Sequence, residues 1–189
     1  DSKGPLASKV IEQLDVMRDQ VNLYLDRARR AARAQAIGAA TDVEPVLQSI
    51  ARTLQRINAA RQITIKVSCP PGLRFRGERQ DLEEMVGNLV DNACKWCKSQ
   101  IAVSAEPLAG GEDGRAWFVI NVDDDGPGIP AAKRATALER GKRLDESKPG
   151  SGLGMSIISE TAGMYSGGIA LADSPLGGLR AALKLPSVG

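Results

Sequence analysis

The chain has 189 residues and carries 25 Lys and Arg against 23 Asp and Glu, so its formal net charge is only +2. This length gives room for one domain of ordinary size plus a helical extension. With balanced charge and six aromatic residues, the chain lacks the basic, aromatic-rich surface of nucleic-acid binders, so nucleic acid is not an expected partner. No apolar stretch approaches the about 18–20 residues that a membrane span needs.

Cysteine and histidine content excludes further kinds of site. The chain has three cysteines and no histidine. A sparse, odd set of cysteines argues against a secreted disulfide framework and for a reducing compartment. Cys94 and Cys97 form a Cys-x-x-Cys pair, but zinc would lack its remaining ligands, so packing on a helix is the favoured interpretation. Without histidine, the chain itself has no imidazole acid–base chemistry.

Residues 5–37 are predicted to form one long helix. Pro5 suits its first turn, and Gly38 suits a left-handed C-terminal cap. Apolar and small side chains recur at alternating steps of four and three, as in helices that pack on other helices: Val10, Leu14, Met17, Val21, Tyr24, Ala28 and Ala31. Such a narrow seam needs a partner helix, with an ordinary domain helix as the alternative.

Residues 39–189 are predicted to form one globular α+β domain. Thr41 and Asp42 resemble an N-cap, and the helix that follows would carry on one face Val46, Leu47, Ile50, Leu54 and Ile57. Further helices are expected at residues 78–98 and 152–165, and strands at residues 63–67, 73–76, 101–105, 117–122, 168–172 and 179–185. Strands arranged mostly as hairpins, with three helices for one face, indicate a two-layer α/β sandwich with a mixed sheet.

The first candidate motif lies on the helix expected at residues 78–98. Asn88 and Asn92 are four residues apart, so their side chains share a helical face, which Lys95 and Trp96 continue one turn later. Amide oxygens can complete the octahedral shell of a Mg2+ ion that retains water and phosphate ligands. Lys95 can then meet phosphate, while Trp96 can stack on a base. A solvated helix face is the alternative for this segment by itself.

The second motif, at residues 122–130, reads VDDDGPGIP. Asp125 could accept a hydrogen bond from the amino group of adenine. Gly126 and Gly128 let the backbone approach a ligand, and Ile129 follows in the same turn. Calcium is an alternative, but the alternating ligands and closing Glu of an EF-hand are missing. A dinucleotide-binding turn is another, but the acidic residues would repel a pyrophosphate and no parallel strand is expected next.

The third motif follows a charged segment. Residues 139–151 have no apolar periodicity and predict a mobile lid, in which Arg143 and Lys148 can neutralise a terminal phosphate. A flexible surface loop is the alternative. The lid leads into a helix whose free N–H groups and positive dipole end suit phosphate. The residues at this junction are Gly150, Ser151, Gly152, Leu153 and Gly154.

In combination, NLVDNACKW, DDDGPGIP and GSGLGMS resemble the N, G1 and G2 boxes of sensor histidine kinases, and ACKWC and ERGKRLDESKPGSGLG are similar to the PhoQ-type branch. The resemblance implies a Bergerat-type ATP-binding domain over about residues 40–187. It makes residues 1–38 the second helix of a dimerisation and phosphotransfer hairpin whose first helix is absent.

The same resemblance implies ATP and Mg2+ as cofactors. Asn88 and Asn92 would serve Mg-ATP, and Lys95 and Trp96 the phosphates and base. Asp125 would contact adenine, and Arg143 and Lys148 the γ-phosphate. In related hydrolases such as gyrase a Glu general base stands where this chain has Asn88, so phosphoryl transfer is favoured over hydrolysis.

The resemblance also implies partners and location. The phosphate would pass to a histidine outside this chain, on a helix of the same or a paired subunit, and then to a response regulator receiver domain. The parent protein would be a homodimer anchored in the bacterial inner membrane, with these residues in the cytoplasm. A non-catalytic ATP-binding interaction module and an ATP-hydrolysing enzyme stay as alternatives.

Overall fold

The structure is a computed structural model that describes residues 39–109, 115–138 and 154–188. The chain divides into two units, Asp1–Gly38 and Ala39–Gly189, and all the described residues belong to the second. The helix expected at residues 5–37 and the lid expected at residues 139–151 lie outside the described residues and stay predictions.

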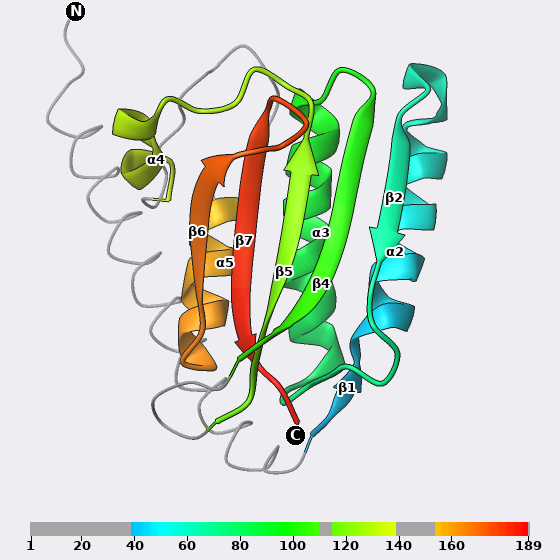
Figure 1. The fold of residues 1–189 in the computed structure, drawn as a ribbon. Coiled ribbons are helices and arrows are strands. Elements are labelled where there is room, and N and C mark those ends of the chain that lie inside the picture. Colours follow the sequence, from blue (N-terminus) through cyan, green and yellow to red (C-terminus); the bar gives the residue numbers. More distant parts are fainter. Residues whose placement is uncertain (1–38, 110–114, 139–153, 189) are drawn as a thin grey trace, which may run out of the picture. The chain divides into compact units, whose positions relative to one another are not determined.

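One layer of the domain is a five-stranded mixed sheet (Figure 1). Its strands, in spatial order, are β2 (Thr64–Ser68), β4 (Gln100–Leu108), β5 (Trp117–Asp124), β7 (Leu179–Pro186) and β6 (Gly168–Asp173). β2 runs parallel to β4, and the other neighbours are antiparallel. The expected mixed sheet and its two hairpins, β4–β5 and β6–β7, are therefore confirmed.

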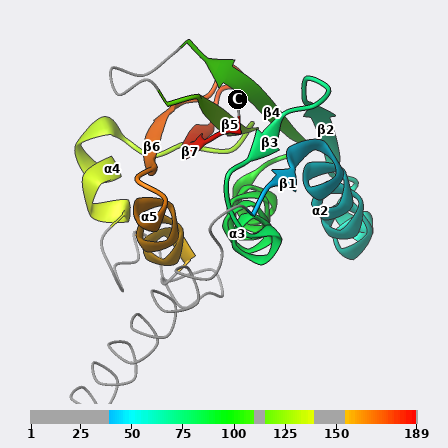
Figure 2. The same cartoon turned by 90° about the horizontal axis from the view of Figure 1, so that it is seen from below.

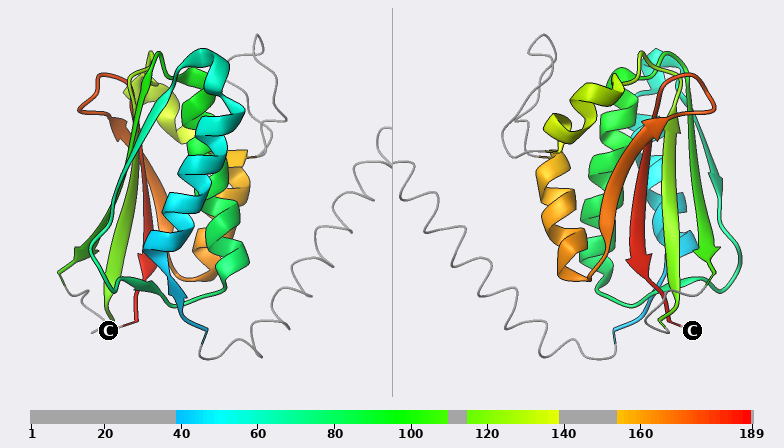
Figure 3. Two further views of the ribbon diagram at one scale, coloured as in Figure 1. Left: turned by 90° about the vertical axis from the view of Figure 1, so that its right-hand side faces the viewer. Right: turned by 60° about the vertical axis from the view of Figure 1, so that its left-hand side comes forward.

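Three helices form the second layer on one face of this sheet (Figures 2 and 3). They are α2 (Val43–Ile57), α3 (Arg79–Trp96) and α5 (Gly154–Met164), and α3 packs between the other two. A shorter helix, α4 (Ala131–Ala137), follows the turn after β5. The expected two-layer α+β sandwich is confirmed. Among the described residues, none of the helices combines the length and apolar character of a membrane-spanning segment.

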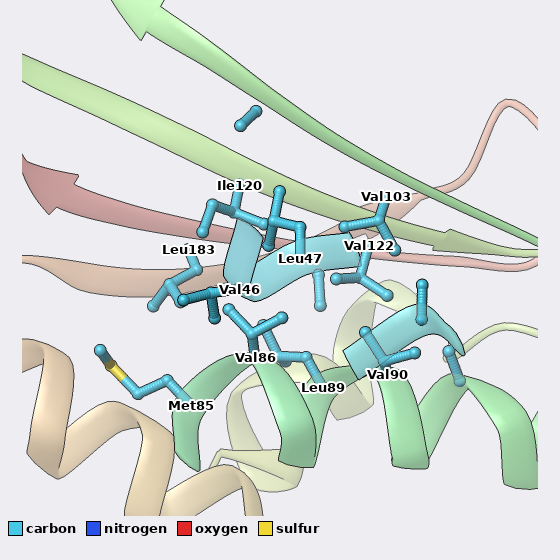
Figure 4. Close-up of a cluster of buried hydrophobic side chains, with 14 of the residues drawn as sticks. Val46, Leu47, Met85, Val86, Leu89, Val90, Val103, Ile120, Val122 and Leu183 are labelled. Atoms are coloured by element: carbon cyan, nitrogen blue, oxygen red, sulfur yellow. The ribbon is translucent and has the colours of Figure 1, made fainter. Parts of the chain in front are cut away.

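The core lies between the two layers (Figure 4). Each strand contributes the side chains on the face that it turns toward the helices. Phe118, Ile120 and Val122 of β5 point toward the helices, because alternate side chains of a strand share a face. On α3 the buried side chains recur at helical spacing: Leu82, Met85, Val86, Leu89, Val90, Ala93 and Cys94. Cys94 and Cys97 belong to this core, which confirms the packing interpretation, and burial raises the pKa of the Cys94 thiol to about 11.

Two local expectations at α2 differ from the structure. Asp42 occupies the N-cap position, but its side chain makes no capping hydrogen bond. Instead β1 (Thr41–Asp42) pairs with β3 (Arg74–Phe75), and Thr41 Oγ1 donates to the Gly77 carbonyl oxygen at 2.8 Å. Ile57 was expected on the buried face, yet its side chain is 71% exposed because α2 ends at this residue, beyond the packed core.

Core packing predicts a large difference between two leucines of the last hairpin. Leu183 is fully buried on β7, whereas Leu176 in the β6–β7 turn is 37% exposed. Leu183→Ala should lower the free energy of unfolding by about 2–5 kcal/mol, because it leaves a cavity. Leu176→Ala should change it by less than about 0.5 kcal/mol. Urea unfolding followed by circular dichroism measures both, and equal losses would contradict this packing.

Candidate functional site

Three segments meet at one end of the sandwich, at the top of Figure 1: the C-terminal end of α3, the end of β5 and the β6–β7 turn. The start of α5 lies lower, beside the middle of α3. A Cβ placed on Gly154 would lie 3.7 Å from Asn88 Oδ1, so the first and third sequence motifs adjoin. The second motif follows β5 directly. The described parts of the three motifs are therefore close in space, although they are far apart in sequence.

The polar face of α3 carries the first motif. Asn88, Asn92, Lys95 and Trp96 are half-buried, in contrast to the fully buried side chains on the core face of the same helix. Asn88 Nδ2 donates to the Glu84 carbonyl oxygen at 2.9 Å, which leaves Oδ1 directed toward the start of α5. Within the described part of the chain, the Asn92 amide has no hydrogen-bond partner. It is thus available for a ligand.

Lys95 does not stand alone on this face. Its Nζ forms an ion pair with Asp91 Oδ2 at 2.6 Å, one turn earlier on α3, and both side chains are more than one third exposed. An ion pair at this exposure stabilises the fold by about 0–1 kcal/mol. Exchange of Asp91 for a phosphate oxygen would therefore cost little.

The turn after β5 packs closely against the end of α3 and against the β6–β7 turn. A Cβ on Gly126 would lie 2.5 Å from the Trp96 carbonyl oxygen at the end of α3, so this position requires glycine. A Cβ on Gly178, in the β6–β7 turn, would lie 2.3 Å from Asp124 Oδ1 and 2.5 Å from the Gly126 nitrogen. Gly128 has a φ of +68°, which also favours glycine. Two glycine-containing turns thus form one end of the site.

Asp124 is buried beneath these turns, with only 3% of its surface exposed. Its Oδ1 accepts hydrogen bonds from the Gly126 nitrogen at 2.8 Å and from the Leu179 nitrogen at 3.3 Å. Its Oδ2 has no donor among the described residues. Burial raises the pKa of this carboxyl, while the two backbone hydrogen bonds act in the opposite direction. Asp124 therefore offers a buried carboxylate with one free oxygen.

Asp125, which the sequence suggested for adenine, has another role in the structure. Its two oxygens accept from the Lys98 nitrogen at 2.8 Å, from the Ser99 nitrogen at 3.1 Å and from Ser99 Oγ at 3.0 Å. Burial alone would raise the pKa of Asp125, but these hydrogen bonds outweigh it and the pKa is lowered. The structure thus disfavours Asp125 as a base contact, because its acceptors are already used to fasten the α3–β4 connection.

Two arginines fasten the surroundings of the site. The Arg61 guanidinium donates to the Cys97 carbonyl oxygen at 3.0 Å and also to that of Cys94, so it caps the C-terminal end of α3. Arg134 of α4 donates from Nε to the Ile129 carbonyl oxygen at 2.9 Å, and its other end pairs with Asp173 at the end of β6. Ile129 is thereby held through its backbone.

The remaining expected site residues fall outside the described part of the chain. They are Arg143, Lys148, Gly150, Ser151, Gly152 and Leu153. Of the third motif, only Gly154 is placed. Sequence reasoning missed Asp124, Gly178, Arg61 and Arg134. For Asp124 a signal was present, because Ile120, Val122 and Asp124 share one side of β5 by strand alternation. Gly178 lies between two expected strands, where no local pattern marks it as a site residue.

The donor set suits a magnesium ion that shares its coordination shell with phosphate. Asn88 Oδ1 and the partner-free Asn92 amide offer neutral oxygens, and Mg2+ commonly takes few protein ligands while it keeps waters and phosphate oxygens. No group of three or more His, Cys, Asp or Glu that could hold a metal occurs among the described residues. The site therefore fits a metal that enters with a nucleotide better than a metal held by protein alone.

Comparison with known proteins agrees with this fold. The chain belongs to the family of histidine kinase-, DNA gyrase B- and HSP90-like ATPases, whose pattern matches residues 77–189. Sensor protein kinase CarS of Pseudomonas aeruginosa is 41% identical over 93% of this chain and 38% of its own length. Sensor protein PhoQ of Escherichia coli is 33% identical over 90% of this chain and 34% of its own length.

Solved structures give the same result. The ATP-binding domain of PrrB from Mycobacterium tuberculosis is 26% identical, with a TM-score of 0.65 over 80% of this chain and 98% of that domain. The resemblance to sensor histidine kinases, including PhoQ, is thus confirmed. The chain spans a little over a third of the length of the two curated relatives.

The fastening role of Asp125 predicts a pH-dependent contribution to stability. Its pKa is lowered in the folded chain from a usual value of 3.8, so the unfolded chain binds a proton more readily. Asp125 should therefore stabilise the fold above pH 3.8, and this contribution should be lost as the pH falls through the folded pKa. Asp125→Asn should lower the free energy of unfolding at pH 7 by about 1 kcal/mol.

The measurement is urea unfolding of both proteins from pH 7 down to pH 3. The difference in free energy of unfolding between the two proteins should become smaller toward pH 3. Asp42→Asn provides a control, because that carboxylate is exposed and makes no capping hydrogen bond. A difference that is constant with pH would show that Asp125 does not act through its charge.

Proposed function

We propose that this chain binds ATP together with Mg2+ and provides the catalytic half of a sensor histidine kinase. The observation that carries the proposal is the convergence of three features at one end of the sandwich: Asn92, which has no hydrogen-bond partner among the described residues, the buried Asp124 and the glycine turns. Membership of a family of ATPases and the likeness to the ATP-binding domain of PrrB support it.

The base would bind at Asp124. The free Oδ2 of this carboxylate is a hydrogen-bond acceptor in a buried place, which suits the exocyclic amine of adenine and would leave the carbonyl of guanine without a donor. The neighbouring glycines at positions 126, 128 and 178 allow the two turns and the end of α3 to pack closely around this carboxylate. Trp96, at the end of α3, would contribute an aromatic wall.

The phosphates would lie toward Asn88, Asn92 and the start of α5. Asn88 and Asn92 would hold the Mg2+ ion, which supplies charge neutralisation for the phosphate oxygens. Lys95 would exchange its pairing with Asp91 for phosphate. Arg143 and Lys148, with residues 150–153, would complete the γ-phosphate site and remain part of the proposal.

The reaction would be transfer of the γ-phosphate to a histidine outside this chain. The chain has no histidine, and at position 88 it has an asparagine, which cannot act as a general base for water. An imidazole nitrogen would form a bond to the γ-phosphorus while the bond to the bridging oxygen breaks and ADP leaves. The protein would contribute orientation and charge neutralisation.

The parent protein would provide the remaining parts. The acceptor helix would belong to the same or a paired subunit, and the phosphate would pass on to a receiver domain. A homodimeric parent anchored in the bacterial inner membrane, with these residues in the cytoplasm, is proposed from the likeness to PhoQ and CarS.

Phosphoryl transfer is tested by adding a separate helical hairpin that bears the acceptor histidine, together with ATP labelled on the γ-phosphate and Mg2+. We expect acid-labile label on that histidine and little free phosphate. The control is the hairpin with His→Gln. Nucleotide binding without labelled hairpin would favour an interaction module, and steady release of phosphate by this chain alone would favour an ATPase.

Paired substitutions distinguish the two candidate base contacts. Asp124→Asn replaces the free Oδ2 by an NH2 group that faces the amine of adenine donor to donor. It should weaken ATP binding about ten- to hundredfold and reduce the preference for ATP over GTP. Because burial disfavours the ionised Asp124, the substitution should not destabilise the fold. Asp125→Asn should leave ATP affinity within about threefold, since hydrogen bonds to Asn keep most of the fastening.

The measurement is isothermal titration calorimetry with ATP and GTP at fixed Mg2+ concentration. Unfolding midpoints of both variants exclude loss of folding as the cause. A larger loss of ATP affinity for Asp125→Asn than for Asp124→Asn would restore Asp125 as the base contact.

A further inference from the structure

A groove outside the candidate nucleotide site lies beside the end of α2. It has a volume of about 520 Å3 and runs between α2 and the start of β2, at the right-hand edge of Figure 1. Arg52, Gln55 and Arg56 of α2 line one side, and Gln62 and Thr64 line the other. The candidate nucleotide site lies beyond α3, so none of its residues contributes to this groove.

The charged side chains that line the groove are all positive. Arg52 and Arg56 are one helical turn apart and exposed, and neither makes an ion pair or hydrogen bond through its side chain within the described part of the chain. Its lining includes no acidic residue. Elsewhere on the domain, cations such as Arg79, Lys95 and Arg180 pair with acids.

The groove also borders an open sheet edge. β2 is the first strand of the sheet and pairs only with β4. The Thr64 nitrogen donates to the Ser99 carbonyl oxygen at 2.8 Å, so Thr64 and Lys66 turn their backbone groups toward β4. Ile65 and Val67 then turn theirs outward. The Ile65 nitrogen is met only by Gln55 Oε1 at 3.4 Å, which is a long hydrogen bond.

We propose that this edge and groove bind an extended, acidic segment of a protein partner. The outward N–H and C=O groups of Ile65 and Val67 would pair with the backbone of the segment, as in β-strand addition. Arg52 and Arg56 would meet its carboxylates, and Gln55 would be displaced from Ile65. Cations beside an edge strand oppose its pairing with basic or apolar strands. A partner strand with acidic side chains would be attracted by the same cations and therefore preferred.

The lining favours a protein segment over other anionic partners. It contains no aromatic side chain on which nucleic-acid bases could stack. The apolar residues of its lining are the small Ala59 and the buried Ile63, so it has no large exposed apolar side chain to insert into a lipid bilayer. The groups that remain are those that bind carboxylates and a peptide backbone.

The experiment measures fluorescence anisotropy of a labelled, capped octapeptide of alternating Glu and Val as the 189-residue chain is added. A peptide of alternating Lys and Val tests charge. A third peptide with the acidic sequence, N-methylated at alternate residues, tests backbone pairing. We expect binding of the acidic peptide alone, and at least about tenfold weaker binding of both comparison peptides at about 0.1 M salt.

The protein variants separate the groove from general surface charge. The double substitution Arg52→Glu and Arg56→Glu should weaken the acidic peptide at least about tenfold. The matched control, Arg74→Glu with Arg76→Glu, reverses two exposed arginines near the opposite end of the domain and should leave affinity unchanged. Circular dichroism and ATP affinity check that each variant is folded.

Three results would overturn the proposal. The N-methylated peptide could bind as tightly as the parent peptide, or the two double variants could lose affinity equally. A thymidine octanucleotide could also bind as tightly as the acidic peptide with the same dependence on Arg52 and Arg56, which would make the groove a general polyanion site.

Discussion

The arrangement of the site depends on one buried carboxylate. Asp124 ends the central strand β5, and its Oδ1 accepts from the backbone of Gly126, in the turn that follows β5, and of Leu179, the first residue of β7. Gly178 also donates its N–H to the Asp124 carbonyl oxygen at 3.1 Å. A carboxylate is costly to bury unless donors meet it, so this residue requires both turns to close on it. The same closure leaves Oδ2 without a donor among the described residues.

Around that carboxylate, side chains outside the site stabilise the segments that form it. Arg61 caps the end of α3, Asp125 fastens the connection from α3 to β4, and Arg134 ties the turn after β5 to the end of β6. None of these three need touch a nucleotide. They set the positions of the residues that would contact the nucleotide. A reaction that depends on the orientation of its reactants needs such supporting contacts.

The sequence predicted the helix and sheet layers well, because the spacing of apolar residues directly reflects which side chains are buried. The spacing of Leu82, Met85, Val86 and Leu89 defined α3, and alternation defined β4 and β5. It could not predict the hydrogen bonds that Asp125 accepts, because the donors on Lys98 and Ser99 lie 27 and 26 residues away. Gly178 shows the same limit: its closeness to Asp124 follows from the pairing of β5 with β7, which no local pattern encodes. Ile57 was misplaced because helical spacing says nothing about where the core ends.

The contact between Asp124 and the β6–β7 turn joins residues that are 55 positions apart. During synthesis, the motifs on α3 and after β5 are made first, but the backbone donor at Leu179 is made only 55 residues after Asp124. Until β7 pairs with β5, Asp124 lacks that donor and one glycine turn of the site is missing. A nascent chain would therefore acquire its core elements before it could retain a nucleotide, and ligand binding would report completion of the domain.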